Sequence, residues 1–346
     1  MQNILVINAL NGSIPLVLQN KYPSAKITCA EVFPFFKQHL TKLGFEVTDW
    51  GSVGDMKFDL VIGNPPYQDT TKTEKGGTTL WSQFIQQATT LVNPAGHLVM
   101  VTPNAWMSFG KSGKPLKGKQ MLQVWTDTSR HFPGVGSTFS SWIMENLPTY
   151  KDTHFLPENI HLDLRNYESL PVGRPIAGID IVEKIKNWEG PKIDPQIETQ
   201  LKVSYSERTD SYSGPANATQ TKIFKYKVFH TNSKTYFCSQ QPTDYEAKKV
   251  IVSTSSPKPT YYADPMGCAT GDLRSYILVD TDQQGENLVA LLETKLYRFV
   301  WKKPGMISYK SLRLPLLDLR KKWTDTELYE YFDLSLDQIC IVENWT

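Results

Sequence analysis

The segment Asn64-Pro65-Pro66-Tyr67 combines residue types that could bind and orient another molecule. The Asn64 side chain can donate and accept hydrogen bonds, and Tyr67 adds a flat aromatic face. The two prolines donate no backbone hydrogen bond and have fixed φ angles, so the chain here should be stiff and extended, with carbonyl oxygens free to accept. These features predict a rigid functional turn. A plain loop of turn-forming residues is the alternative.

The elements around this turn are expected to alternate between strands and helices. Strands separated by helices at this spacing predict a mostly parallel, doubly wound α/β sheet. Ligands of such sheets bind at the carboxyl ends of the strands, near the switch in strand order. Glu31, Asp49 and Asn64 all follow predicted strands. The predicted strands are 4–8, 27–30, 46–48, 58–62 and 97–101, the predicted helices are 16–21, 35–43 and 80–92, and a turn is predicted at 93–96.

The composition is that of a globular protein of more than one domain. The chain has 346 residues, 40% of them hydrophobic, and a net charge of +2. No apolar stretch is long enough to span a bilayer, and the N-terminus lacks the features of a secretory signal, so a cytoplasmic location is expected. The cysteines are far apart and form no C-x-x-C pair, which favours reduced thiols over a disulfide framework or a metal site. They are Cys29, Cys238, Cys268 and Cys340.

The second half of the chain has a different pattern. A connecting region with a helix at 179–188 is followed, after residue 201, by short segments typical of β strands. The stretch 295–313 carries six basic residues and no acidic one. A solvated face is the simpler interpretation of such a run, but interleaved aromatic residues favour nucleic-acid binding. Those aromatic residues are Tyr297, Phe299, Trp301 and Tyr309.

The chain resembles the S-adenosylmethionine-dependent N6-adenine DNA methyltransferases of restriction–modification and phage type. The resemblance rests on Asn64-Pro65-Pro66-Tyr67 and extends through LWSQFIQQATTLVNPAGHLVMVTPNAW, HFPGVGSTFSSWIMEN and WTDTELYEYFDLSLDQICIVENW. It leaves out roughly residues 150–290. It implies a Rossmann-like catalytic domain, a connecting segment, a β-rich target-recognition domain that binds double-stranded DNA, and a short helical C-terminal segment. The corresponding ranges are 1–150, 151–200, 201–322 and 323–346.

The resemblance implies a chemical role for each residue of the turn. The Asn64 side-chain oxygen and the Pro65 carbonyl would accept the N–H bonds of adenine N6 and favour a tetrahedral nitrogen. Pro65 and Pro66 would hold that geometry before the substrate arrives. Tyr67 would stack on the base after it leaves the duplex. No cysteine follows a proline, so the Pro-Cys nucleophile of C5-cytosine methyltransferases is absent.

The cofactor contacts are also implied by the resemblance. Glu31 would accept hydrogen bonds from the ribose hydroxyls of S-adenosylmethionine, and Asp49 would bind its adenine amino group. Asn8, Gly12 and Asn64 would line the rest of the cofactor site. A solvated strand end is the alternative for either acid.

The expected DNA contacts are less specific. Phe139 and Trp142 resemble the late aromatic residue that supports the target base, or they are core residues of a hairpin. Basic residues in both halves could contact DNA phosphates. These are Lys119, Lys222, Lys225, Lys227, Lys248, Lys249, Arg298, Lys302 and Lys303.

Two departures from the family leave alternatives open. Relatives carry at least two glycines after the first strand, whereas residues 8–15 contain only Gly12, with Ile14 where a second glycine is expected. The family's segment before the first strand would have to be supplied elsewhere, as would any restriction endonuclease. A DNA-binding relative that has lost its cofactor is therefore an alternative. N4-cytosine methylation is another, because the same acceptor geometry suits any exocyclic amine on a planar base. Glutamine methylation of release factors is disfavoured by the long second half.

Overall fold

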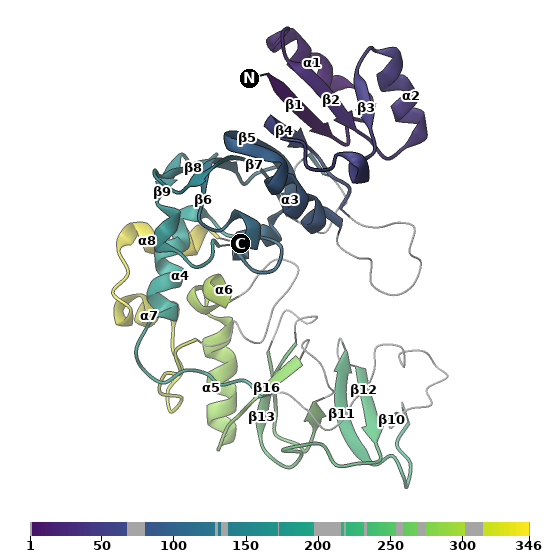
Figure 1. Cartoon of the computed structure of the whole chain (residues 1–346). Coiled ribbons are helices and arrows are strands. Elements are labelled where there is room, and N and C mark those ends of the chain that lie inside the picture. Colours follow the sequence, from purple (N-terminus) through teal and green to yellow (C-terminus); the bar gives the residue numbers. More distant parts are fainter. Residues whose placement is uncertain are drawn as a thin grey trace. The chain divides into compact units, whose positions relative to one another are not determined.

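The computed structural model describes residues 2–67, 80–128, 131–132, 138–171, 173–196, 216–217, 219–231, 234–253, 259–268, 274–301 and 314–345 (Figure 1). The chain forms two compact units, Met1–Ala177 and Gly178–Thr346. Within the described residues, every helix is too short or too polar to cross a membrane.

The first unit is built on one nine-stranded sheet in the order β3-β2-β1-β4-β5-β7-β6-β8-β9. Strands β1 to β5 are parallel, β7 is antiparallel to both β5 and β6, and β8 is parallel to β6. This confirms the predicted doubly wound, Rossmann-like fold. The strands are β1 (Asn3–Ile7), β2 (Lys26–Ala30), β3 (Glu46–Thr48), β4 (Phe58–Gly63), β5 (Val92–Pro103), β6 (Lys119–Trp125), β7 (Phe139–Pro148), β8 (Thr153–Leu156) and β9 (Ile160–Leu162).

The helices of this unit pack through apolar residues at helical spacing. In α3 the buried positions include Trp81, Phe84, Ile85 and Ala88, which recur every three or four residues and so share one face. Strand β1 is buried from Ile4 to Ile7, as expected for a central strand covered on both sides. The helices are α1 (Ser13–Lys21), α2 (Pro34–Lys42) and α3 (Leu80–Leu91).

Strand β5 begins earlier than the sequence pattern predicts. The predicted turn at 93–96 lies inside it, because Phe58 pairs with Val92 whereas Leu60 pairs with His97. The extra residues form a bulge in which Ala95 has a φ of 59°. A bulge and a turn use the same residue types, so the sequence pattern could not distinguish them.

Gly63 is required where β4 ends. A Cβ atom added there would lie 2.6 Å from the Ile7 carbonyl oxygen of the neighbouring strand β1. Only glycine lets the two backbones approach so closely, immediately before the Asn64 turn.

The predicted connecting segment 151–200 belongs to both units. It contributes β8 and β9 to the first sheet and α4 (Ile179–Lys186) to the second unit. Backbone pairing of β6 with β8 extends the sheet past residue 150, which no local signal predicted.

The second unit combines two small sheets with a helical core. Helices α5, α7 and α8 each begin with a capping box, at Thr281, Thr324 and Ser335. The core packs α4 and these helices around α6, so residues 323–346 are part of it. The elements are β10 (Ala216–Asn217), β11 (Tyr226–Thr231), β12 (Lys234–Cys238) and β15 (Gly267–Cys268) in one sheet, β13 (Lys249–Ser253), β14 (Thr260–Tyr262) and β16 (Arg274–Leu278) in the other, and α5 (Asp282–Glu293), α6 (Lys295–Trp301), α7 (Asp325–Tyr331) and α8 (Leu336–Asn344).

Candidate active site

The candidate site lies at the carboxyl ends of β1, β2 and β4. Strand β1 has β2 on one side and β4 on the other, so the strand order switches between β1 and β4. Asn8 follows β1 and Asn64 follows β4, and the Asn8 Nδ2 donates to the Asn64 backbone oxygen at 2.7 Å. The Asn8 Oδ1 atom is buried and has no hydrogen-bond partner among the described residues. Two of the predicted site residues are therefore in direct contact.

Within the turn, Tyr67 orients Asn64. The Tyr67 hydroxyl donates to the Asn64 Oδ1, and both side chains are half-buried. Burial raises the pKa of Tyr67 to about 12, so its hydroxyl keeps its proton at neutral pH. An amide oxygen has two lone pairs, so Asn64 Oδ1 can accept a second hydrogen bond from a ligand.

An aromatic cluster lies beside the turn. The Tyr67 ring is 4.9 Å from Phe139 and 6.1 Å from Phe132, and the rings of Phe132 and Phe139 stack at 4.5 Å. Phe139 is 1% exposed, whereas Phe132 is only half-buried. Phe132 is thus the aromatic residue better placed to meet a ligand. The sequence analysis missed its role, although it lies in the HFPGVG block.

Trp142 does not join this cluster and is a core residue. It lies an odd number of positions after Phe139 on β7, so the two side chains point to opposite faces of the sheet. Its indole nitrogen donates to Thr102 Oγ1 at 2.9 Å, and its ring packs 5.7 Å from Trp106. The assignment of Trp142 to the target base was therefore wrong.

Glu31 holds the loop that follows β1. Its side chain is fully buried, and its carboxylate accepts backbone N–H bonds from Leu10 at 2.9 Å, Val32 at 2.8 Å and Phe33 at 3.1 Å. These three donors compensate for burying a charged group. The buried Glu31 charge also acts on the nearby thiol of Cys29. Burial of the thiol and this charge raise its pKa to about 12.

The loop after β1 is strongly curved although it contains one glycine. Asn8, Leu10 and Gly12 have φ angles of 57°, 47° and 85°, all in the left-handed region. This conformation costs a leucine about 1–2 kcal/mol, and the hydrogen bond from Leu10 to Glu31 helps to hold it.

Replacing Leu10 by glycine should stabilise the protein by about 0.5–1 kcal/mol. The left-handed strain that is relieved exceeds the entropy that a glycine loses on folding. Denaturant unfolding measures the change. Gly12→Ala is the control in the opposite direction, because its Cβ would lie 2.9 Å from the Leu43 Cδ1 at a positive φ. A destabilised Leu10→Gly variant would contradict the strain.

Asp49 is at the carboxyl end of β3, as predicted, but it is exposed. It forms an ion pair with Lys37, and its side chain keeps 63% of its accessible surface. The residue before Asp49 is bonded to the site, because the Glu31 N–H donates to the carbonyl of Thr48 at 3.1 Å. The adjacent Trp50 ring stacks on Phe84 at 4.8 Å.

Lys119 lies at the amino ends of the parallel strands, whereas the candidate site lies at their carboxyl ends. It begins β6, which runs parallel to β5, so it is at the amino end of its strand. Its Nζ donates to the Asn146 Oδ1 at 2.8 Å. Lys119 is therefore not part of the candidate site, and its contact with DNA stays a prediction.

The described aromatic residues of the run at 295–313 are buried in α6 and do not form an exposed surface. Tyr297, Phe299 and Trp301 are at most 1% exposed and belong to the core around α6, beside a half-buried Arg298. Five of the seven residues of α6 are buried, and Lys295 at its start is exposed and pairs with Glu343. Lys302, Lys303 and Tyr309 lie outside the described residues.

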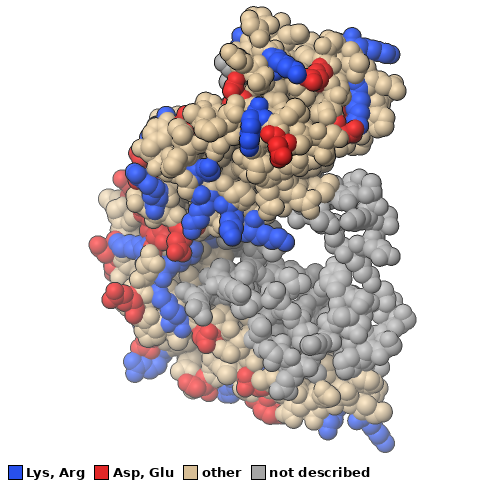
Figure 2. Space-filling view, in the orientation of Figure 1, with Lys and Arg blue, Asp and Glu red and all other residues tan. Residues whose placement is uncertain are grey.

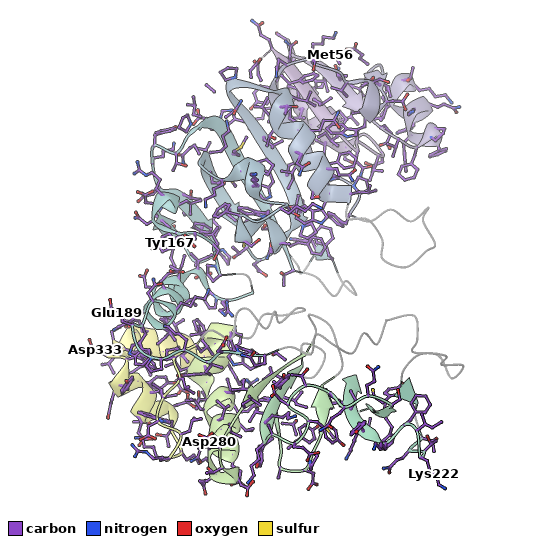
Figure 3. The ribbon with its side chains drawn as sticks, turned by 60° about the horizontal axis from the view of Figure 1, so that its bottom comes forward. Met56, Tyr167, Glu189, Lys222, Asp280 and Asp333 are labelled. Carbon is purple, nitrogen blue, oxygen red and sulfur yellow. The ribbon has the colours of Figure 1, made fainter. Side chains whose placement is uncertain are left out.

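Two other lysines that were predicted to contact DNA phosphates, Lys249 and Lys222, differ in their exposure to solvent. Lys249 is 1% exposed, and its Nζ donates to the carbonyls of Asp244, Tyr245 and Met266, so it cannot face a phosphate. Lys222 is exposed and projects from the second unit (Figure 3). On the visible face of each unit, basic and acidic side chains are interspersed (Figure 2).

Replacing Lys249 by methionine should lower the free energy of unfolding by about 2 kcal/mol, because buried carbonyls lose their donor. The affinity of the folded variant for duplex DNA should not change. Denaturant unfolding and fluorescence anisotropy measure the two quantities. Lys222→Met is the matched control and should leave stability nearly unchanged. Loss of DNA affinity without loss of stability in Lys249→Met would contradict the structural role.

The fold and the site together define a Rossmann-like α/β domain with a candidate ligand site at the switch point of its sheet. In sequence, residues 15–127 match the family model of the Eco57I restriction-modification methylase. Comparison with curated proteins finds no match.

Several solved structures are similar to part of the chain. A class I S-adenosylmethionine-dependent methyltransferase of Listeria monocytogenes is 15% identical, with 45% of this chain and 58% of that one covered and a TM-score of 0.35. The M protein of the type I restriction enzyme EcoKI is 11% identical, with 47% and 41% covered and a TM-score of 0.34. A 16S rRNA methyltransferase of T. thermophilus, in complex with AdoMet and guanosine, is 13% identical, with 42% and 38% covered and a TM-score of 0.30. The match thus spans about half the length of the first two of these proteins.

Proposed function

We propose that the chain is an S-adenosylmethionine-dependent DNA methyltransferase that modifies the N6 amino group of adenine. The observation that carries the proposal is the Asn64 turn at the switch point of the sheet, with its side-chain oxygen oriented by Tyr67. The match of residues 15–127 to a restriction-modification methylase supports DNA as the substrate.

The residues at the switch point fit the proposed cofactor. The buried Asn8 Oδ1 has no partner among the described residues and could accept a hydrogen bond from an ammonium group. The Glu31 carboxylate accepts three backbone hydrogen bonds, from Leu10, Val32 and Phe33, and a carboxylate offers about four acceptor positions, so one remains for a ribose hydroxyl. Asp49 is exposed at the next strand end and could accept from an adenine amino group. When bound, the cofactor supplies the methyl group.

The turn would act on the amino group of the substrate. Asn64 Oδ1 and the Pro65 carbonyl accept its two N–H bonds, which favours a tetrahedral nitrogen with an available lone pair. The base stacks against the aromatic cluster of Tyr67 and Phe132, and base–aromatic stacking of about 1–3 kcal/mol offsets the cost of leaving the duplex. The two prolines keep the acceptors in place without a conformational change.

A labelling experiment tests the proposal. The full chain is incubated with mixed-sequence duplex DNA and S-adenosylmethionine labelled in the methyl group, and the DNA is digested to nucleosides for mass spectrometry. Labelled N6-methyldeoxyadenosine is the expected product. Labelled N4-methyldeoxycytidine would instead identify cytosine as the target base. A folded chain that yields no labelled nucleoside would contradict the proposed enzyme.

A second candidate is a DNA-binding relative that has lost its cofactor. It is favoured by the engagement of Glu31 with the backbone of the first loop and by the presence there of only one glycine. This candidate predicts DNA binding without any affinity for S-adenosylmethionine.

A further inference from the structure

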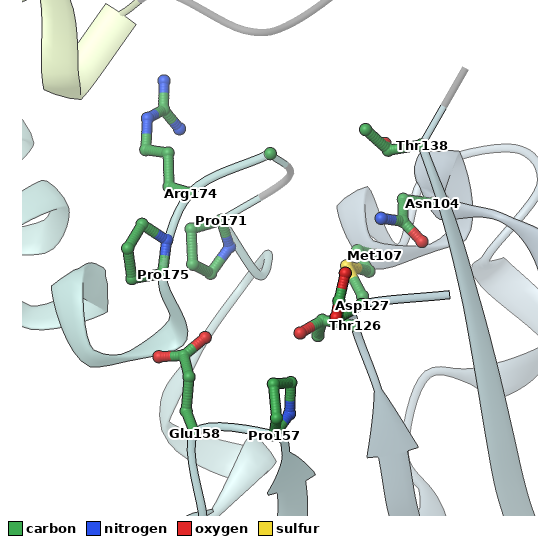
Figure 4. A pocket seen from close by; sticks show the side chains of 11 residues that line it. Asn104, Met107, Thr126, Asp127, Thr138, Pro157, Glu158, Pro171, Arg174 and Pro175 are labelled. Carbon is green, nitrogen blue, oxygen red and sulfur yellow. The ribbon is translucent and has the colours of Figure 1, made fainter. Parts of the chain in front are cut away.

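A cavity of about 370 Å³ lies beyond the carboxyl ends of strands in the first sheet, and Figure 4 shows the side chains that line it. One side is lined by residues that come directly after β5, β6 and β8, three strands that run in the same direction. Thr138, directly before antiparallel β7, lies on the same side. Pro171, Arg174 and Pro175 line the opposite side (Figure 4). Residues that line the cavity include Asn104, Met107, Asp127, Thr138, Pro157, Glu158, Pro171, Arg174 and Pro175.

The cavity adjoins the catalytic turn through Phe139. Thr138, in the cavity wall, directly precedes Phe139, whose ring packs 4.9 Å from Tyr67. The Asn104 N–H donates to the Thr138 carbonyl at 2.9 Å, which fixes Asn104 at this border. The cavity wall and the aromatic cluster therefore use consecutive residues of the chain.

Asn104 is a buried amide at the border between the cavity and β7. It is 5% exposed, and its Oδ1 has no partner among the described residues. Buried polar groups are nearly always paired, so an amide in this state is suited to a ligand that donates to it. A carboxamide also matches the donor and acceptor pattern on the edge of a nucleobase.

The charge and shape of the cavity select the kind of ligand. Asp127 and Glu158 outnumber Arg174, which disfavours a phosphate. The Glu158 oxygens also accept the backbone N–H groups of Ile176 at 2.8 Å and Ala177 at 2.9 Å. Met107 and the prolines give apolar walls, and such walls with a few polar groups suit a flat uncharged heterocycle.

We propose that this cavity binds an unpaired nucleobase that carries an exocyclic amine, with Asn104 accepting a hydrogen bond from that amine. The inference rests on the proposed function, because it places a second base of the DNA substrate beside the target base. It makes Asn104 a specificity residue, distinct from Asn64.

Binding of free deoxynucleosides tests the inference independently of methyl transfer. Deoxycytidine, deoxyadenosine and thymidine are titrated by calorimetry into an Asn64→Ala variant, in which the catalytic turn has lost its acceptor. Deoxycytidine and deoxyadenosine should bind about tenfold more tightly than thymidine, which has no exocyclic amine. Adding Asn104→Ala should weaken their binding at least tenfold, whereas adding Asn166→Ala, an exposed control outside the cavity, should not change it.

The outcomes separate this site from the catalytic turn. Equal binding with and without Asn104→Ala, or no binding of any nucleoside, would overturn the inference even if DNA methylation is found. Binding that depends on Asn104 would support it even if methylation is not found. If Asn104→Ala does not fold, Asn104→Asp keeps the acceptor and the volume. That variant should still prefer deoxycytidine to thymidine, and equal affinity for the two would overturn the inference.

Discussion

Replacing Asn64 by alanine is expected to lower the rate of methyl transfer by about 10²–10³-fold, the usual cost of losing one hydrogen-bonding group aimed at developing charge. The side-chain oxygen that would accept an amino N–H of the base is lost, and Tyr67 loses its hydrogen-bond partner. Affinity for DNA should not change, because the rest of the surface remains. Single-turnover methylation and fluorescence anisotropy measure the two quantities.

The comparison for Asn64→Ala is Asn166→Ala, which removes the same group from an exposed position of the first unit. It should methylate DNA at the rate of the unaltered chain. An Asn64→Ala variant with an unchanged rate would show that the turn does not carry the chemistry. Equal losses in both variants would point to a general effect on the fold.

The second large effect is expected from Glu31→Ala. The change leaves three backbone N–H groups without their acceptor, and an unsatisfied buried donor costs about 1–3 kcal/mol. We therefore expect the free energy of unfolding to fall by about 3 kcal/mol or more. The affinity for S-adenosylmethionine should fall as well, because Leu10 is no longer held. Denaturant unfolding and calorimetry measure the two effects.

Glu46→Ala is the control for this prediction. Glu46 pairs with Lys26 at 3.0 Å, but both side chains are more than half exposed, so the pair should contribute less than about 1 kcal/mol. A Glu31→Ala variant that keeps its stability and loses only cofactor affinity would contradict the structural role of Glu31. It would leave the ribose contact as the main role of this residue.

The first unit could be predicted from the sequence largely because its signals are local. The runs at 4–8 and 58–62 correspond to β1 and β4, and a strand followed by two prolines identifies the turn. Contacts between distant residues could not be predicted. Nothing in the sequence indicates that the Glu31 carboxylate accepts the N–H of Leu10, or that Phe132 stacks on Phe139.

The incorrect predictions have a common physical cause. Periodicity does not show which face of an element is covered, so Trp142 and Lys249 could be assigned to ligands although both are buried. For the same reason, the aromatic residues of α6 resembled a DNA-binding surface. Helices α5 and α6 also lie within the range 201–322, which the sequence pattern predicted as β-rich. The helices were missed there because their burial depends on contacts with α4, α7 and α8.

The proposed methyl transfer requires that the switch point between β1 and β4 binds S-adenosylmethionine, although the loop there has a single glycine. Calorimetric titration of S-adenosylmethionine into the full chain tests it. We expect one site per chain with micromolar affinity, lost in Glu31→Ala. No binding to a chain shown to be folded would contradict the proposed enzyme and favour the DNA-binding relative.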